Sequence, residues 1–242
     1  MSQLKFGDLK PKIILGIAAH PDDLDFGAAG TLAKFAKAGA EIHYLILTDG
    51  SKGSDQPDMT PAQLVKLRQK EQQQAVKIIG GKGVDFLNYT DGELEITMKL
   101  KSDIVKVIRR VRPDVVVTMD PTMVYSPARG FINHPDHRAA GQATLDAVFP
   151  LARDHLAFPE LFEAGLLPHK TATVLLINFD QNNYVVDVSN SFDIKIAALK
   201  AHASQVVDID LVENRMREHA ELIGRQAGYQ LAESFMRIDI AG

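Results

Sequence analysis

The stretch "KIILGIAAHPDDLDFGAAG" at residues 12–30 decides the expected fold. Residues 12–19 form an apolar run with a β-branched start, which is typical of a buried parallel strand. Residues 27–38 then place Ala, Leu and Phe at helical spacing, and Gly39 is suited to end that helix. A buried strand that leads directly into a helix is the first unit of a parallel α/β sheet.

The same alternation of strands and helices continues along the chain. Further strands are predicted at residues 42–47, 84–87, 115–119, 173–178, 184–188 and 233–240. Further helices are predicted at residues 61–79, 97–111, 136–149, 194–203 and 209–227. Parallel strands joined through helices need right-handed crossovers. We therefore expect a single-domain, Rossmann-like α/β fold over residues 1–242, with a doubly wound, mostly parallel sheet and helices on both faces.

Composition limits the classes of function. The chain of 242 residues has 45% hydrophobic and 24% charged residues, a formal net charge of −4 and a pI near 6.1. No basic cluster indicates a nucleic-acid or membrane partner. The N-terminus lacks the apolar core of a signal peptide, so the cytoplasm is expected. The chain has no cysteine, so a metal must be bound by nitrogen and oxygen. Both a monomer and a homo-oligomer are compatible with the sequence.

A first polar cluster follows the first predicted strand. His20, Asp22 and Asp23 stand at the carboxyl end of that strand, where ligands bind in open α/β sheets. Imidazole and carboxylate are the usual non-thiolate ligands of zinc and other divalent metals, and a metal would relieve the repulsion between adjacent carboxylates. The alternative is that an aspartate only caps the helix that follows.

A second cluster, "INHPDHRAAG" at residues 132–141, repeats the His-Pro-Asp order more than a hundred residues later. It adds His134, Asp136 and His137, again just before a predicted helix. Catalytic zinc usually has three protein ligands and one open position, which neither cluster supplies alone. Together they offer His20, Asp23 and His137 as ligands, and two helix caps would not require histidine at either place.

These residues resemble a known family. "AHPDDLDFGAAGTLA" (residues 19–33) with "HPDH" (residues 134–137) is similar to the PIG-L/LmbE-like zinc-dependent N-acetylglucosaminyl deacetylases. "RQKEQQQAVKIIG" (residues 68–80), "FLNYTDGEL" (residues 86–94) and "ALKAHASQ" (residues 198–205) extend the resemblance over much of the chain.

The resemblance implies a role for each residue of the two clusters. It implies that His20, Asp23 and His137 bind Zn²⁺, although another divalent metal would suit the same ligands. It also implies that Asp22 is the general base and His134 a general acid or oxyanion partner. Two positions depart from the family pattern: Leu24 replaces the usual acidic residue, which puts substrate detail in doubt, and Ile132 stands where some members have tyrosine.

Three further residues each have an expected functional role and a structural alternative to it. Asp136 is expected to orient an imidazole, and its alternative is a helix N-cap. The resemblance implies that Arg68 and Asp91 contact sugar hydroxyl groups at the rim of the site. The residues alone favour a solvated helix arginine and a turn aspartate before Gly92.

The expected function is removal of an acetyl group from a small N-acetylated amino sugar or glycoconjugate by a zinc-dependent N-deacetylase. Zinc lowers the pKa of bound water to about 7 and polarises the amide carbonyl. One alternative is a metal-dependent hydrolase of another amide or of a phosphoester, which often needs two metals. The other is a catalytically inactive sugar-binding protein. The sequence does not identify the sugar or the aglycone.

Overall fold

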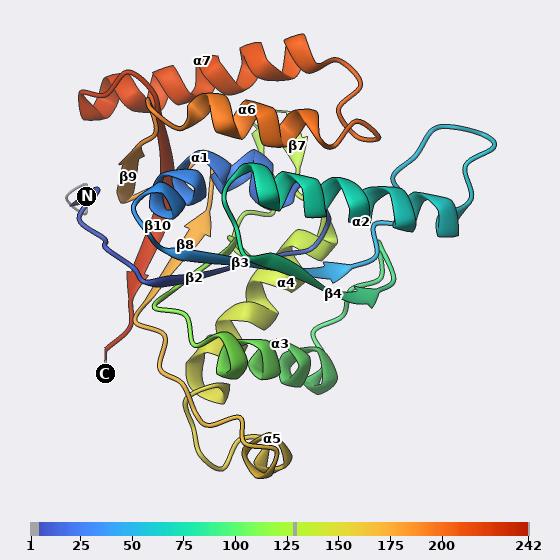
Figure 1. Ribbon diagram of the computed structural model, residues 1–242, viewed down its shortest axis with the longest axis vertical. Helices are drawn as coiled ribbons and strands as arrows, with labels where there is room; N and C mark the ends of the chain where they lie inside the picture. Colours follow the sequence, from blue (N-terminus) through green and yellow to red (C-terminus); the bar gives the residue numbers. More distant parts are fainter. Residues whose placement is uncertain (1–4, 128–129, 242) are drawn as a thin grey trace.

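The computed structural model describes residues 5–127 and 130–241, which form three layers, with helices on both sides of a central sheet (Figure 1). The strands of that sheet are β1 (Lys5–Phe6), β2 (Ile13–Ala18), β3 (Glu41–Thr48), β4 (Gly83–Tyr89), β5 (Val115–Met119), β8 (Thr173–Ile177), β9 (Tyr184–Asp187) and β10 (Ala232–Asp239). Their order is β1-β9-β10-β8-β5-β2-β3-β4, and all pairs are parallel except those of β10 with β8 and β9. The expected mostly parallel α/β sheet is confirmed.

The helices divide between the two faces. They are α1 (Asp23–Lys37), α2 (Pro61–Ile78), α3 (Met98–Val111), α4 (Pro135–Asp146), α5 (Pro159–Glu163), α6 (Phe192–Lys200) and α7 (Ile209–Ala227). Figure 1 shows α1, α2, α6 and α7 above the sheet and α3, α4 and α5 below it. Each face has its own apolar core, because alternate residues of a strand point to opposite faces. Ile14 and Ala18 of β2 lie in one core, and Leu15 and Ile17 lie in the other.

The order of the strands places a topological switch at β2. The chain runs outward from β2 to β3 and β4, then returns to add β5 on the opposite side of β2. Ligands of open α/β sheets bind at such a switch, beyond the carboxyl ends of the strands. The loops after β2 and β5 are therefore the expected positions for a site.

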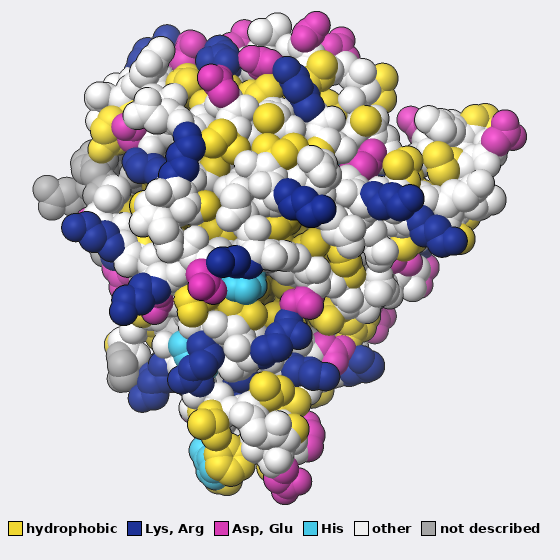
Figure 2. All heavy atoms as spheres, in the orientation of Figure 1, with side chains coloured by type: hydrophobic (Ala, Val, Ile, Leu, Met, Phe, Trp, Pro, Cys, Tyr) yellow, Lys and Arg dark blue, Asp and Glu magenta, His cyan; other side chains and the backbone are white. Residues whose placement is uncertain are grey.

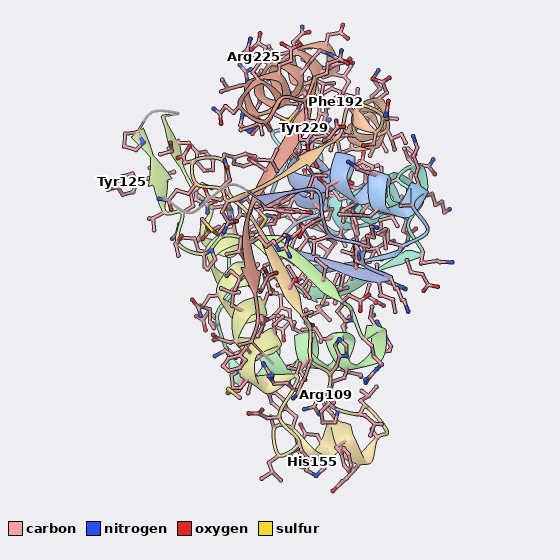
Figure 3. The ribbon with its side chains drawn as sticks, turned by 90° about the vertical axis from the view of Figure 1, so that its left-hand side faces the viewer. Arg109, Tyr125, His155, Phe192, Arg225 and Tyr229 are labelled. Carbon is pink, nitrogen blue, oxygen red and sulfur yellow. The ribbon has the colours of Figure 1, made fainter. Side chains whose placement is uncertain are left out.

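Several elements differ from the sequence prediction. Helix α1 begins at Asp23, four residues before the predicted start at Gly27. Residues 121–135, between the predicted strand at 115–119 and the next predicted helix, contain a small hairpin, β6 (Tyr125–Ser126) and β7 (Phe131–Ile132). It projects from the body, with Tyr125 pointing outward (Figure 3). The helix predicted to reach Phe149 is instead interrupted there: Phe149 has an extended backbone (φ −141°, ψ 120°), the conformation that a residue before proline prefers.

A buried ion pair ties the last strand to the first long helix. Lys195 Nζ of α6 donates to Glu233 Oε1 of β10 at 2.6 Å and to the Phe26 carbonyl of α1 at 2.7 Å. Glu233 also accepts hydrogen bonds from the backbone amides of Gly30 and Thr31. Both charged groups thus have partners, as buried charges require.

On the face drawn in Figure 2, Lys and Arg side chains are scattered among acidic and neutral ones. Among the described residues, no helix combines the length and the apolar character that crossing a membrane would require.

Candidate metal centre and active site

The two His-Pro-Asp segments meet at the switch in the sheet. His20 follows β2, and the segment from His134 to His137 begins α4 after the loop that leaves β5. Strands β2 and β5 are neighbours, so the two loops emerge side by side at the same edge of the sheet. The rings of His20 and His137 have centroids 5.3 Å apart.

Three candidate ligands point their donor atoms at one another. His20 Nδ1 lies 3.3 Å from His137 Nε2, and Asp23 Oδ1 lies 3.0 Å from the same His137 atom. The distance from His20 Nδ1 to Asp23 Oδ2 is 3.6 Å. Ligands held about 2.0–2.1 Å from a tetrahedral zinc lie about 3.3 Å apart, so the spacing of these atoms suits such an ion.

The other nitrogen of each ring faces an acceptor. His20 Nε2 lies 3.0 Å from Asp91 Oδ1 and 3.2 Å from Asp136 Oδ2. His137 Nδ1 lies 2.9 Å from Asn133 Oδ1. Protons on these nitrogens leave the lone pairs of His20 Nδ1 and His137 Nε2 directed at the centre, which is the usual orientation of metal-binding histidines.

The local charges also suit a cation. Burial lowers the pKa of His20, but hydrogen bonds to Asp136, Asp23 and Asp91 raise it to about 12. Burial opposes ionisation of Asp23, yet the charge of His137 holds the Asp23 pKa well below its ordinary value. Three carboxylates thus surround the two imidazoles, and their negative charge would also favour a divalent cation.

Asp22 has an unusual backbone and a separate environment. Its φ is 102°, a value that residues other than glycine rarely adopt and that is found at functional sites. Its amide donates to Gln72 Oε1 at 2.9 Å, and its carboxylate accepts from Arg68 Nη2 at 3.2 Å. Burial and the charge of Asp23 raise the pKa of Asp22 to about 7, against the opposing charge of Arg68. Its side chain makes no cap hydrogen bond to α1, so the capping alternative is wrong for Asp22.

Arg68 and Asp91 are buried inside the site. Arg68 is 4% exposed and donates to the carbonyls of Pro21 at 2.7 Å and Gly50 at 3.0 Å. Asp91 is 5% exposed and accepts from the Lys52 amide at 2.9 Å. The alternative of a solvated helix arginine is therefore wrong, and Asp91 does more than end a turn.

His134 caps α4, and Asp136 supports the centre. The amide of Asp136 donates to His134 Nδ1 at 3.2 Å, which leaves the ring proton of a neutral His134 on Nε2. Burial, then the charge of His20, lowers the pKa of His134. The Asp136 carboxylate accepts from the amides of Gly92 at 2.7 Å and Leu94 at 3.2 Å. The N-cap alternative for Asp136 is wrong, because His134 occupies that position.

Sequence reasoning missed a buried network behind Asp22. The Asp25 carboxylate accepts hydrogen bonds from the Tyr44 hydroxyl and, at 2.8 Å, from Gln72 Nε2. It also lies 2.8 Å from His202 Nε2. His202 is fully buried, so it lies in the interior of the fold. Leu24, which replaces the usual acid, is fully buried and lies over Gly16, while Asp25 supplies a buried carboxylate next to it. The sequence shows Asp23 and Asp25 close to Asp22. It does not indicate that Asp23 faces the metal centre and Asp25 the buried network.

Comparison with known proteins gives consistent matches. Residues 15–148 match the PIG-L family, described as GlcNAc-PI de-N-acetylase. A diacetylchitobiose deacetylase of Thermococcus kodakarensis is 34% identical over 94% of this chain and 83% of its own length. A probable N-acetyl-alpha-D-glucosaminyl L-malate deacetylase 2 of Bacillus anthracis is 29% identical over 79% of this chain and 80% of its own.

The fold agrees with these matches. The crystal structure of N,N'-diacetylchitobiose deacetylase from Pyrococcus horikoshii, complexed with its inhibitor, aligns with a TM-score of 0.87 at 29% identity. The alignment covers 95% of this chain and 84% of that one. The matched segment includes both His-Pro-Asp clusters, and the chain belongs to the PIG-L family of metal-dependent N-deacetylases.

Proposed function

We propose that the protein is a zinc-dependent N-deacetylase that removes the acetyl group from a small N-acetylated amino sugar. The observation that carries the proposal is the donor triad of His20, Asp23 and His137, whose atoms lie 3.0–3.6 Å apart. Relatives named for diacetylchitobiose and for N-acetylglucosaminyl malate support this class of substrate.

His20, Asp23 and His137 would hold the ion. All three donors are nitrogen or oxygen, so zinc is suited and another divalent metal remains an alternative. When bound, zinc would supply Lewis acidity toward the amide carbonyl and toward water. Asp136 and Asp91 hold the His20 ring through Nε2, and Asn133 holds the His137 ring through Nδ1.

Asp22 is the proposed general base. A base works best when its pKa lies near the operating pH, and the pKa of Asp22 is raised to about 7 by burial and by Asp23. Arg68 fixes the orientation of the carboxylate at 3.2 Å, and Gln72 fixes the peptide that carries it. After accepting a proton from water, Asp22 delivers it to the departing amine.

His134 is the proposed oxyanion donor. Its Nδ1 accepts a backbone hydrogen bond, so its Nε2–H is directed away from α4 and is available to the carbonyl oxygen of the substrate. Its lowered pKa favours a neutral donor over the protonated acid that the family resemblance also allows. Substrate contact by Arg68 and Asp91 is a smaller part of the proposal, because both side chains already bond to the protein.

The test is release of amine from a panel of N-acetylated sugars. The panel contains N-acetylglucosamine, diacetylchitobiose and N-acetylglucosaminyl malate. Protein stripped by a chelator should release no amine, and addition of about one equivalent of Zn²⁺ should restore release. Two bound metals and phosphoester hydrolysis without amine release would contradict the proposal. Sugar binding in calorimetry without released acetate would also contradict it.

A further inference from the structure

An apolar cavity opens directly from the proposed metal ligands. It has a volume of about 250 Å³, and Asp23 and His137 stand at its wall. Most of its lining is carbon and sulfur, contributed by Phe26, Met119, Met123, Ile177, Phe179 and Met216. The cavity is therefore a continuation of the site rather than a separate pocket.

The lining of the cavity comes from the ends of two strands and from helix α7. Met119 and Ile177 are the last residues of β5 and β8, and they are 5% and 1% exposed. Met216 of α7 is half-buried and also lines the cavity. Methionine side chains are flexible and fill irregular space, so a lining with three methionines can adjust to its occupant.

The cavity continues outward. A second hollow of about 510 Å³ shares Phe131, Phe179 and Met216 with the first, and it extends to Arg215 and His219 of α7. Phe131 belongs to the β6–β7 hairpin that projects in Figure 3. The two hollows thus adjoin each other at these three residues.

The polar groups of the cavity are already engaged. Among the described lining residues, only Asp23, Asn133 and His137 are polar. Asn133 Nδ2 donates to the Met123 carbonyl at 2.7 Å, and its Oδ1 faces His137. A sugar ring placed here would lose its hydrogen bonds to water without replacement, which is unfavourable. An alkyl group has no such loss.

We propose that this cavity binds the acyl group of the substrate, and that the enzyme hydrolyses amino sugars whose N-acyl chains are longer than acetyl. The inference rests on the proposed function, because it places the reacting amide at the ligand triad. An apolar cavity of about 150 Å³ already accepts benzene, so about 250 Å³ is far more than one methyl group needs. Chains of about four to six carbons fit such a volume.

The connectivity of the amide favours the acyl chain over the aglycone. The alkyl group is bonded to the carbonyl carbon, which is the reacting atom beside Asp23 and His137. The aglycone is several bonds further away, across the sugar ring. In the reaction, the oxygen of water bonds to that carbon, the C–N bond breaks, and the nitrogen takes up a proton. The products are a free amine and a linear carboxylate that remains in the apolar cavity until release.

The experiment compares N-acetyl-, N-butanoyl- and N-hexanoyl-glucosamine with hexyl N-acetylglucosaminide on the zinc-loaded protein. Each methylene that enters an apolar site favours binding by about fourfold, so butanoyl, with two more methylenes, should exceed acetyl by about sixteenfold in kcat/KM. A fall in kcat/KM from acetyl to butanoyl overturns the inference but leaves the proposed function standing. A gain only for the hexyl glycoside places the aglycone in the cavity and also overturns it.

Variants on α7 test the position of the chain. Met216→Trp fills the outer wall and should lower the ratio of hexanoyl to acetyl activity by at least about tenfold. Leu222→Trp is the control: it places tryptophan on the same helix at a residue that is 48% exposed, and it should leave that ratio unchanged. Equal ratios in both variants overturn the inference, and melting curves identify a variant that fails to fold.

A binding measurement separates this inference from the proposed function. Hexanoate should bind the zinc-loaded protein at least about tenfold more tightly than acetate in calorimetry. If no N-acyl sugar is hydrolysed, the proposed function fails. The relative affinities for hexanoate and acetate then still decide whether the cavity accepts an alkyl chain. Equal affinities overturn the assignment of the cavity.

Discussion

The two His-Pro-Asp segments have the same order of residues but opposite environments. In the first, Asp22 lies in a strained turn before α1, and burial with the charge of Asp23 raises its pKa to about 7. In the second, Asp136 lies in the first turn of α4. There burial opposes ionisation, but hydrogen bonds from His20 and two backbone amides lower the pKa of Asp136. The same residue type is thus prepared to exchange a proton in one segment and to stay ionised in the other.

The contrast shows that position in the fold, rather than the motif, assigns the role. A carboxylate that accepts several hydrogen bonds is held as an anion and can orient a neighbour. A carboxylate beside a like charge, with a single arginine as partner, is held near the pKa that a general base needs. Substitution of Asp22 should therefore lower turnover, whereas substitution of Asp136 should lower metal affinity.

Asp22→Asn should have the largest effect on turnover. It removes the base but keeps the shape, and asparagine tolerates a positive φ better than most residues. We expect kcat to fall by about a hundredfold to ten-thousandfold with about one zinc per chain retained. Steady-state kinetics and metal analysis on the same sample check both parts. Loss of zinc in proportion to activity would instead make Asp22 a ligand.

Two substitutions of His134 separate its proposed catalytic role from its role as the cap of α4. His134→Ala should lower kcat by about a hundredfold to a thousandfold and also cost about 1 kcal/mol of stability, because α4 loses its cap. His134→Asn should lose the same activity but keep the stability, since asparagine is a good N-cap. Activity assays and denaturant unfolding distinguish the two. Full activity in His134→Asn would contradict the oxyanion role.

Asp136→Asn should weaken metal binding rather than the chemical step. Residues that hold a ligand histidine typically contribute about tenfold to a hundredfold in metal affinity. Competition with a chelator measures the change. Asp120→Asn is the matched control, because Asp120 is also buried but bonds to Thr122 and Asn178 instead. Equal affinities in both variants would contradict the supporting role of Asp136.

The smallest effect is a pH dependence of metal affinity. Burial lowers the pKa values of His20 and His137, but the neighbouring carboxylates raise both, that of His20 to about 12, so protons compete with a metal for these rings. A metal needs the unprotonated nitrogens, so binding should release protons and strengthen as the pH rises. Calorimetry in two buffers of different ionisation enthalpy measures the release. Affinity independent of pH would show that the histidines are already neutral.

Much of the fold follows from short-range pattern. The apolar run at β2, followed directly by helix α1, predicts a parallel sheet. In that sheet the topological switch at β2 makes β2 and β5 neighbours, so the loops that carry the two clusters lie at one edge. Thr60 and Thr97 begin α2 and α3 with side-chain caps that the sequence makes visible.

The remaining features depend on distant partners. Residues 233–240 suggest a strand but not its place, and β10 pairs antiparallel between β8 and β9. The burial of Arg68 depends on the carbonyls of Pro21 and Gly50, which no helical pattern reveals. Asn133 carries no local signal for its contact with His137, although its position four residues earlier in the chain is compatible with one.

The central place of β10 has a consequence for how the protein is made. Synthesis delivers both His-Pro-Asp segments long before Glu233, whose carboxylate holds the amides of Gly30 and Thr31 in α1. A nascent chain that lacks β10 has every donor for zinc but leaves β8 and β9 unjoined. A chain synthesised only as far as β9 therefore carries all the candidate ligands while its sheet is still incomplete.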